Sequence, residues 1–276
     1  MIDSSRGVLF PSRLPSFHRL PPPAGVAHLV MWFWIPEWNL PPGVTSRQDI
    51  VAYPALNPVI EPHQVTLSGA TTRATHRELS GTGWAVGALL RPAAVAALVE
   101  SPSALVDGIR TIQAPDLHHA VTEAMVPSAV QVPEPRAAST AEDADGSARR
   151  TAAVTAFAAW LAASNVSAAD LHANALSEVF LGEEPARTLA EAASRLAVSE
   201  RTLQRMAHRY VGVTPAAMIR RRRLQEAAER VREDPDADLA TLASELGYAD
   251  HAHLTRDFRV VLGMAPTTYR AGTQGQ

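Results

Sequence analysis

Cysteine is absent from the 276-residue sequence, which excludes a disulfide framework, a thiolate zinc site and a cysteine nucleophile. Any metal site would therefore depend on histidine and carboxylate ligands, and the histidines are scattered along the chain. Neither a phosphate-binding glycine loop nor a serine, histidine and aspartate arrangement stands out. We therefore expect no catalytic residues, no metal and no cofactor.

Long apolar runs are also absent. The longest uncharged apolar run, residues 27–35, is far too short to span a bilayer. The N-terminus lacks the basic segment and apolar core of a secretory signal. These features predict a cytoplasmic protein that makes no contact with a membrane.

Lysine is the third absence, because all 25 basic residues are arginine. This fits a GC-rich genome as well as a need for bidentate guanidinium groups. Although the net charge is −3, the charge is unevenly divided. Residues 1–186 carry 11 Arg and 17 acidic residues, whereas residues 187–276 carry 14 Arg and 11 acidic residues. The basic C-terminal third is thus the part suited to a nucleic-acid partner.

The composition changes along the chain in a way that predicts two domains. Seventeen of the 21 prolines precede residue 150 and separate short apolar runs, typical of a small β-barrel or sandwich with a few short helices. The strand candidates are residues 26–35, 50–53, 65–67 and 84–90, and the helix candidates are residues 93–100 and 116–124. The predicted divisions are a β-rich domain (1–125), a linker (126–148), a connecting helix (149–165) and an all-helical domain (166–276). The expected fold class is α+β.

The connecting helix carries one apolar face, formed by Val154, Phe157, Ala158 and Leu161 at helical spacing. Two interpretations are open: the face closes the first domain, or it packs against its copy in a homodimer. Because a soft linker transmits little, we expect the N-terminal domain to act mainly by pairing two chains through this face.

The C-terminal third contains an internal repeat. Three residues recur at an offset of 50: Leu189, Ala193 and Leu196 become Leu239, Ala243 and Leu246. Four more recur at an offset of 51: Leu203, Arg205, Gly212 and Pro215 become Leu254, Arg256, Gly263 and Pro266. The single inserted residue falls in or near a turn, where it costs little.

Each copy is typical of two short helices joined by a tight turn, which is a helix-turn-helix unit. Ser199 and Asp250 are suited to cap the second helix of each copy. The polar residues expected on the outer faces of these second helices are Arg201, Thr202, Gln204, Arg205 and Arg209, then His251, His253, Thr255, Arg256 and Arg259. Such side chains can bond base edges and phosphates. The helix between the copies carries the run 220–223 of four arginines, for which phosphate contact and a salt-bridged helix face are both open.

Residues 166–272 resemble the DNA-binding domain of the AraC/XylS family of bacterial regulators. The resemblance rests on the stretches 199–205, 212–215, 222–224 and 227–228, then 242–243, 247–248, 254–259, 263–266 and 269–270. One departure is Ala197, at a turn position where glycine is often used; if the backbone there needs a positive φ, alanine costs about 1 kcal/mol.

This resemblance implies a sequence-specific transcription regulator with double-stranded DNA as its partner, and RNA polymerase as a further partner if it activates. The family's base readers fall on Arg201, Thr202, Gln204, Arg205, His251, Ala252 and Arg256, and we add Arg209, His253 and Thr255 to the DNA-binding set. The alternatives are an architectural DNA-binding protein and an enzyme with an appended helix-turn-helix module. Repair methyltransferases with a similar module need acceptor cysteines, which disfavours the enzyme.

Residues 12–112 more loosely resemble the cupin-like sensor domain of one branch of this family. The resemblance rests on the aromatic run 32–34, the turn at 54–58 and the passage 87–94. A cupin metal site uses a His-x-His pair and a carboxylate, whereas His76 and Glu78 offer one of each. A small-molecule effector could bind among Trp32, Trp34 and Trp84, although aromatic strand residues usually form the core.

Overall fold

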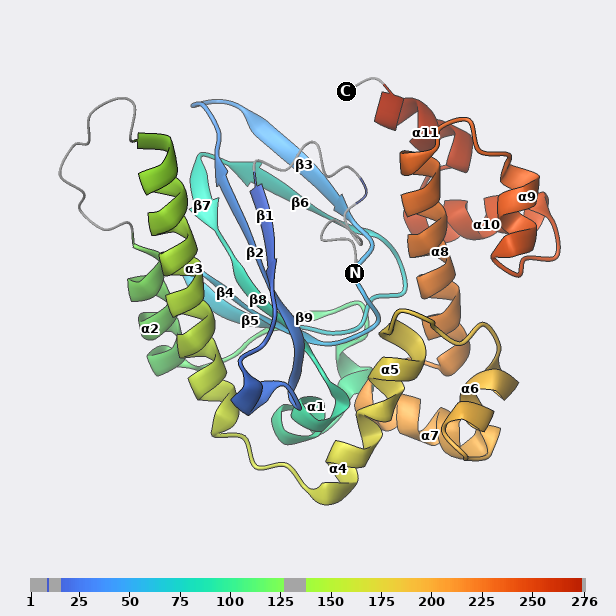
Figure 1. Ribbon diagram of the computed structural model, residues 1–276, viewed down its shortest axis with the longest axis horizontal. Coiled ribbons are helices and arrows are strands. Elements are labelled where there is room, and N and C mark those ends of the chain that lie inside the picture. Colours follow the sequence, from blue (N-terminus) through green and yellow to red (C-terminus); the bar gives the residue numbers. More distant parts are fainter. Residues whose placement is uncertain (1–8, 10–15, 127–137, 275–276) are drawn as a thin grey trace.

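The computed structural model describes residue 9, residues 16–126 and residues 138–274. Within these residues the N-terminal half is built on an antiparallel sheet of seven strands in the order β1-β2-β8-β4-β5-β9, with β7 also paired to β2 (Figure 1). The strands are β1 Ser16–Leu20, β2 Val30–Asn39, β4 Asn57–Glu61, β5 Gln64–Ser68, β7 Thr82–Trp84, β8 Val86–Leu90 and β9 Ile109–Thr111. Every residue of the central strand β8 is buried.

The strand predictions for residues 26–35, 65–67 and 84–90 correspond to β2, β5 and β7–β8, although β2 begins at Val30 and residues 26–29 are not strand. A separate two-stranded sheet consists of β3 (Thr45–Ile50) and β6 (Thr75–Ser80). The prediction of a strand over 50–53 is wrong beyond Ile50. There the carbonyl groups of Val51 and Ala52 leave the sheet and accept hydrogen bonds from a C-terminal helix.

The β-rich half also contains short helices. They are the 3₁₀ turns η2 (Ala24–Val26) and η3 (Pro102–Leu105) and the helices α1 (Pro92–Leu98) and α2 (Pro115–Met125). Proline stands at the first turn of α1 and α2, where a missing backbone N–H costs nothing. The predicted α+β fold class is confirmed, while the cupin likeness stays a prediction.

The long helix α3 (Ala138–Ala162) packs with α2 against the sheet, on the side away from the C-terminal helices (Figure 1). It begins at Ala138 rather than at residue 149, so the last part of the predicted linker is helical; residues 127–137 lie outside the described residues. The Phe157 ring lies edge-on to Phe33, with ring centroids 5.4 Å apart. Pairing of two chains through Val154, Phe157 and Leu161 is therefore wrong, because all three are buried inside one chain.

The rest of the described chain is helical. The helices are α4 Ala168–Ala173, α5 Ala175–Leu181, α6 Leu189–Arg195, α7 Glu200–Tyr210, α8 Pro215–Glu233, α9 Leu239–Glu245, α10 His251–Leu262 and α11 Pro266–Gln274. None of the helices in the described ranges is both long and apolar enough to cross a membrane. The long helix α8 runs between two helix pairs, α6–α7 near one end and α9–α10 near the other (Figure 1).

The two halves of the molecule are in direct contact. Arg221 of α8 donates to the carbonyl oxygens of Ala52 (2.9 Å) and Arg73 (3.0 Å) and to the Thr71 hydroxyl. The backbone N–H of Ala74 donates to the carbonyl oxygen of Val261, near the end of α10, at 2.6 Å.

Apolar contacts accompany these hydrogen bonds. Leu9 and Val51 complete the core around α9–α11, and the Tyr269 hydroxyl donates to the carbonyl oxygen of Leu9 at 2.6 Å. Within the described residues, packing and hydrogen bonds therefore join the two halves directly.

Candidate nucleic-acid interface

The first helix-turn-helix unit consists of α6 and α7. Ala192 and Ala193 of α6 and Leu203 and Ala207 of α7 are all buried in one apolar cluster. Small alanine side chains at the crossing let the two helix backbones approach closely, as the tight turn of a helix-turn-helix unit requires. The second unit repeats this arrangement in α9 and α10, with a core formed by Leu239, Leu242, Ala243, Leu246, Leu254, Phe258 and Val261.

Side-chain caps fix where both second helices begin. The Ser199 hydroxyl accepts from the backbone N–H of Thr202 at 3.2 Å, and the Asp250 carboxylate accepts from the N–H of His253 at 2.6 Å. Both caps satisfy backbone donors that the first turn of a helix would otherwise leave without a partner. The two cap predictions are correct.

The turn before each second helix needs a left-handed backbone conformation. Gly247 has a φ of +74° and Ala197, at the equivalent position, a φ of +50°. Glycine adopts this conformation at no steric cost, whereas alanine brings its Cβ too close to the neighbouring carbonyl. The backbone at Ala197 thus has the positive φ at which the sequence analysis expects alanine to be strained, so the turn of the first unit carries this strain.

The predicted DNA-binding residues of the first unit lie along α7. Arg201, Gln204 and Arg205 are exposed, whereas Thr202 is half-buried and its hydroxyl lies 3.0 Å from that of Ser199. Arg209 is also exposed, and it lies near Asp170 of α4 and the ring of its neighbour Tyr210. Its guanidinium lies 3.9 Å from the Asp170 carboxylate and 5.2 Å from the Tyr210 ring centroid.

The Asp170 carboxylate itself accepts hydrogen bonds from Ser167 and Tyr210. Ser167 hydrogen bonds lower the pKa of its carboxyl most, and the Tyr210 hydroxyl, which donates to it at 3.0 Å, lowers it further. Arg209 thus has a carboxylate partner inside the protein, whereas Arg201 and Arg205 have no ion pair among the described residues. The free guanidinium groups of α7 gather toward its first half.

The predicted residues of the second unit lie on α10. His251, Ala252, His253 and Arg256 are exposed, and Thr255 is half-buried with its hydroxyl 3.3 Å from Nε2 of His251. The His253 ring stands edge-on to the Tyr248 ring, with centroids 5.3 Å apart. Arg256 and the exposed Arg259 one turn later supply the cationic groups of this face.

The arginine run 220–223 does not form a phosphate-binding face. Arg221 and Arg222 are buried, and burial lowers the pKa of Arg221 to about 10. Arg220 is paired with the Asp257 carboxylate of α10 at 2.8 Å. The interpretation of the run as a salt-bridged, structural face is the correct one, because its partners are carbonyl oxygens and a carboxylate of the same chain.

Sequence reasoning missed the residues that link the two units, among them Arg187 in the segment before α6. Its guanidinium donates to the carbonyl oxygen of Glu245 at the end of α9 at 2.6 Å. No motif carries this signal, since the acceptor is a backbone oxygen whose position depends on the tertiary fold.

The geometry suits a bipartite contact with duplex DNA. Helix α8 has 19 residues and spans about 28 Å at 1.5 Å per residue. The recognition helices α7 and α10 lie toward opposite ends of α8 (Figure 1). Successive major grooves on one face of DNA are about 34 Å apart, which is of the same order.

The aromatic residues considered for an effector pocket serve packing. Trp32 is buried against Tyr53, with ring centroids 4.9 Å apart, and the Trp34 indole N–H donates to the side-chain oxygen of Asn57 at 3.1 Å. A side chain at Gly87 would overlap the Trp34 ring. Among the described side chains, no three His, Asp or Glu residues gather as a group that could hold a metal ion.

Comparison with known proteins agrees with this geometry. Residues 192–272 match a family described as a helix-turn-helix domain, and residues 18–108 match a family described as a domain of unknown function (DUF6597). A protein of Streptomyces antibioticus described as an AraC-like transcription regulator is 40% identical over 93 residues, covering 33% of this chain and 30% of that protein. The transcriptional activator RhaS of Pectobacterium carotovorum is 33% identical over 78 residues, 28% of each chain. The chain therefore matches less than a third of the length of these relatives.

Solved structures share only a distant likeness. ToxT from Vibrio cholerae O395 aligns over 94% of this chain and 97% of its own, with a TM-score of 0.39 and 12% identity. An AraC-type regulator from Chromobacterium violaceum aligns over 36% of this chain and 88% of its own, with a TM-score of 0.31 and 23% identity. Such TM-scores carry no weight for the fold or function. The family match and the two capped helix pairs agree that residues 192–272 form a helix-turn-helix domain, and this part of the chain is similar to AraC-like regulators.

Proposed function

We propose that this protein is a transcription regulator that binds double-stranded DNA sequence-specifically through both helix-turn-helix units. The observation that carries the proposal is the pair of exposed polar faces on α7 and α10, one on each unit. Arg201, Gln204 and Arg205 can bond guanine and adenine edges, and Arg256 takes the place of Arg205 in the second unit.

The proposed contact set also includes the shorter side chains of the same faces. Thr202, His251, Ala252, His253 and Thr255 lie in the first turns of the recognition helices, which contact base edges in helix-turn-helix proteins. Arg209, with its carboxylate partner Asp170, is proposed as a phosphate contact rather than a base reader.

The test is in vitro selection of DNA from a random library by the full chain, followed by footprinting on the recovered sequence. The proposal expects a bipartite motif whose two halves are centred about 10 bp apart. Binding that depends on salt but not on sequence would instead support an architectural protein. Recovery of no DNA above background would contradict both functions.

We further propose that the N-terminal half regulates DNA binding through its direct contacts with α8 and α10. A small-molecule effector that shifts the loops at 51–53 or 71–74 would move Arg221 and the end of α10. A thermal-shift screen of small molecules, followed by DNA affinity with each hit, tests this. Hits that raise the melting temperature and leave DNA affinity unchanged would argue against it.

The proposal has two further parts. The protein forms homodimers, and it contacts RNA polymerase if it activates transcription. Light scattering of the full chain with and without its selected DNA tests the first, since a second half-site gains affinity only when two chains are joined. The relatives' names, AraC-like regulator and transcriptional activator, support regulation rather than catalysis as the role.

A further inference from the structure

The two helix-turn-helix units have separate apolar cores. Helix α8 contributes Met218 and Ile219 to the cluster around α6 and α7. It contributes Leu224, Ala227, Ala228 and Val231 to the cluster around α9 and α10. The described hydrogen bonds that join the two units come from arginine side chains.

Arg223 of α8 makes such contacts to both units at once. Its Nη1 donates to the carbonyl oxygen of Gly247 at 3.1 Å, in the turn between α9 and α10, and its Nη2 donates to the carbonyl oxygen of Arg187 before α6. The guanidinium also lies 5.8 Å from the Tyr248 ring centroid. The planar guanidinium of Arg223, with five N–H donors, thus contacts both the segment before the first unit and the turn of the second unit.

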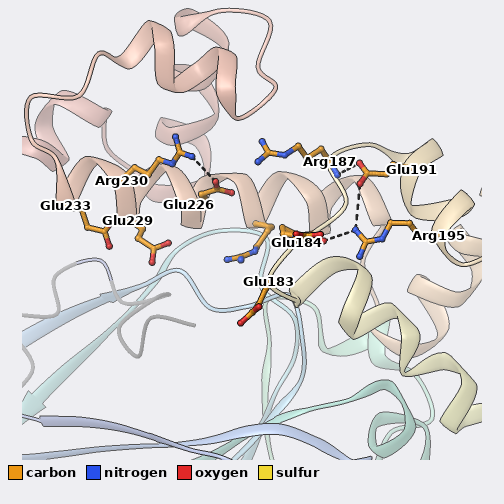
Figure 2. A pocket seen from close by; sticks show the side chains of 11 residues that line it. Glu183, Glu184, Arg187, Glu191, Arg195, Glu226, Glu229, Arg230 and Glu233 are labelled. Atoms are coloured by element: carbon orange, nitrogen blue, oxygen red, sulfur yellow. Dashed lines mark hydrogen bonds and ion pairs between the residues drawn. The ribbon is translucent and has the colours of Figure 1, made fainter. Parts of the chain in front are cut away.

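One more arginine makes a direct contact between the units, and another holds the Glu245 side of that contact. Arg187 donates through Nη1 to the carbonyl oxygen of Glu245 (2.6 Å), while its backbone N–H donates to the Glu191 carboxylate (2.8 Å). Arg230 bridges Glu226 and Glu245. Figure 2 shows Arg187, from the segment before α6, and Arg230 of α8 among the side chains that line a cleft of about 460 Å³. The Glu245 carbonyl is the last of α9 and that of Gly247 lies in the turn just after it; the end of a helix leaves such acceptors open and favours positive charge.

We propose that Arg223 is a positioning residue that fixes the orientation of the two recognition helices and so sets the spacing between the two half-contacts on DNA. This rests on the proposed function. Each inserted base pair moves a half-contact along the duplex and rotates it by about a tenth of a turn. Rigid units therefore tolerate one spacing, whereas loosely joined units tolerate several.

The first test needs no DNA and uses the absence of cysteine. Spin labels are attached after His208→Cys on α7 and Val260→Cys on α10, both exposed and outside the proposed contact set. Double electron–electron resonance on the full chain then measures the distribution of distances between the labels on the two recognition helices. Arg223→Ala should broaden this distribution about twofold, because a charged donor with two acceptors is lost.

Arg195→Ala is the matched control. Arg195 bonds the carbonyl oxygen of Glu184 and pairs with Glu191, both on the side of the first unit, and should leave the distribution unchanged. Circular dichroism verifies that each variant is folded, and Arg223→Lys supplies a milder change if the alanine variant is not. Equal widths for the wild type and for each Arg223 variant that folds would overturn the proposal.

The second test repeats the DNA selection with the wild type and Arg223→Ala in parallel. The wild type should recover one spacing, with affinity falling at least about tenfold when 1 bp is inserted; the variant should recover several spacings with differences under about threefold. An unchanged single spacing in the variant would contradict the inference while leaving the proposed function intact. Failure of the wild type to recover any motif would contradict the proposed function, and the assignment of spacing to Arg223 would fall with it, whatever the label distances show.

Discussion

Ala197 holds the tight turn of the first unit at a φ of +50°, a conformation that its counterpart Gly247 adopts freely. We predict that Ala197→Gly raises the free energy of unfolding by about 0.5 to 1 kcal/mol. The relief of left-handed strain exceeds the entropy that glycine adds to the unfolded chain. Urea unfolding followed by circular dichroism measures the change. Gly247→Ala is the reciprocal control and should be destabilising; a less stable Ala197→Gly would show that the turn is not strained.

For single residues, the sequence predicts the interactions whose partners lie close by in the chain. The caps Ser199 and Asp250 follow from residue type and position, since their partners lie three residues on. The role of Arg221 could not be predicted, because it bonds the carbonyl oxygen of Ala52, 169 residues away. A run of arginines has the same appearance in a sequence whether it meets phosphate or buried backbone oxygens.

Among the elements, α3 is the one whose role differs most from expectation. Its apolar periodicity predicted the helix but could not name the surface it covers, which is the sheet of the same chain. In its described early turns, ion pairs join Arg149 to Asp145 at 3.2 Å and Arg150 to Glu37 of β2 at 2.8 Å.

Phe157→Ala tests this placement. Removing a fully buried ring that packs on Phe33 should lower the free energy of unfolding by about 3 to 5 kcal/mol. Thermal unfolding gives the stability and light scattering the mass, which should not change. Thr155→Ala, exposed on the same helix, should shift stability by less than about 0.5 kcal/mol. A lower mass with unaltered stability would restore pairing through this face.

In the whole molecule, the N-terminal half is docked on the helices that carry both recognition faces. Arg221→Ala should lower the free energy of unfolding by about 2 to 4 kcal/mol, because three acceptors at Ala52, Thr71 and Arg73 lose a charged donor. Hydrogen exchange should then speed up around residues 51–53 and 71–74. Arg259→Ala removes the same charge from an exposed site and should leave both measurements unchanged. Equal effects of the two variants would indicate that the docking adds little stability.

The β-rich character of the N-terminal half and the helical repeat could be predicted because periodicity and composition are local properties. The docking of Leu9 and Val51 into the core of the second unit could not, since nothing in either segment indicates its distant partner. The predicted domain divisions stay a prediction. In the structure the core around α9–α11 draws on both halves of the chain, so residues 166–276 alone would lack part of it.

The central claim is that both units read DNA together. Its most direct measurement is hydroxyl-radical footprinting and affinity of the full chain on its selected DNA, for the wild type, Arg205→Ala and Arg256→Ala. The account predicts two protected regions about 10 bp apart, with each variant losing about 1 to 3 kcal/mol of affinity and relaxing specificity in one region only. One continuous protected region, or variants that weaken all sequences equally without relaxing specificity, would contradict it.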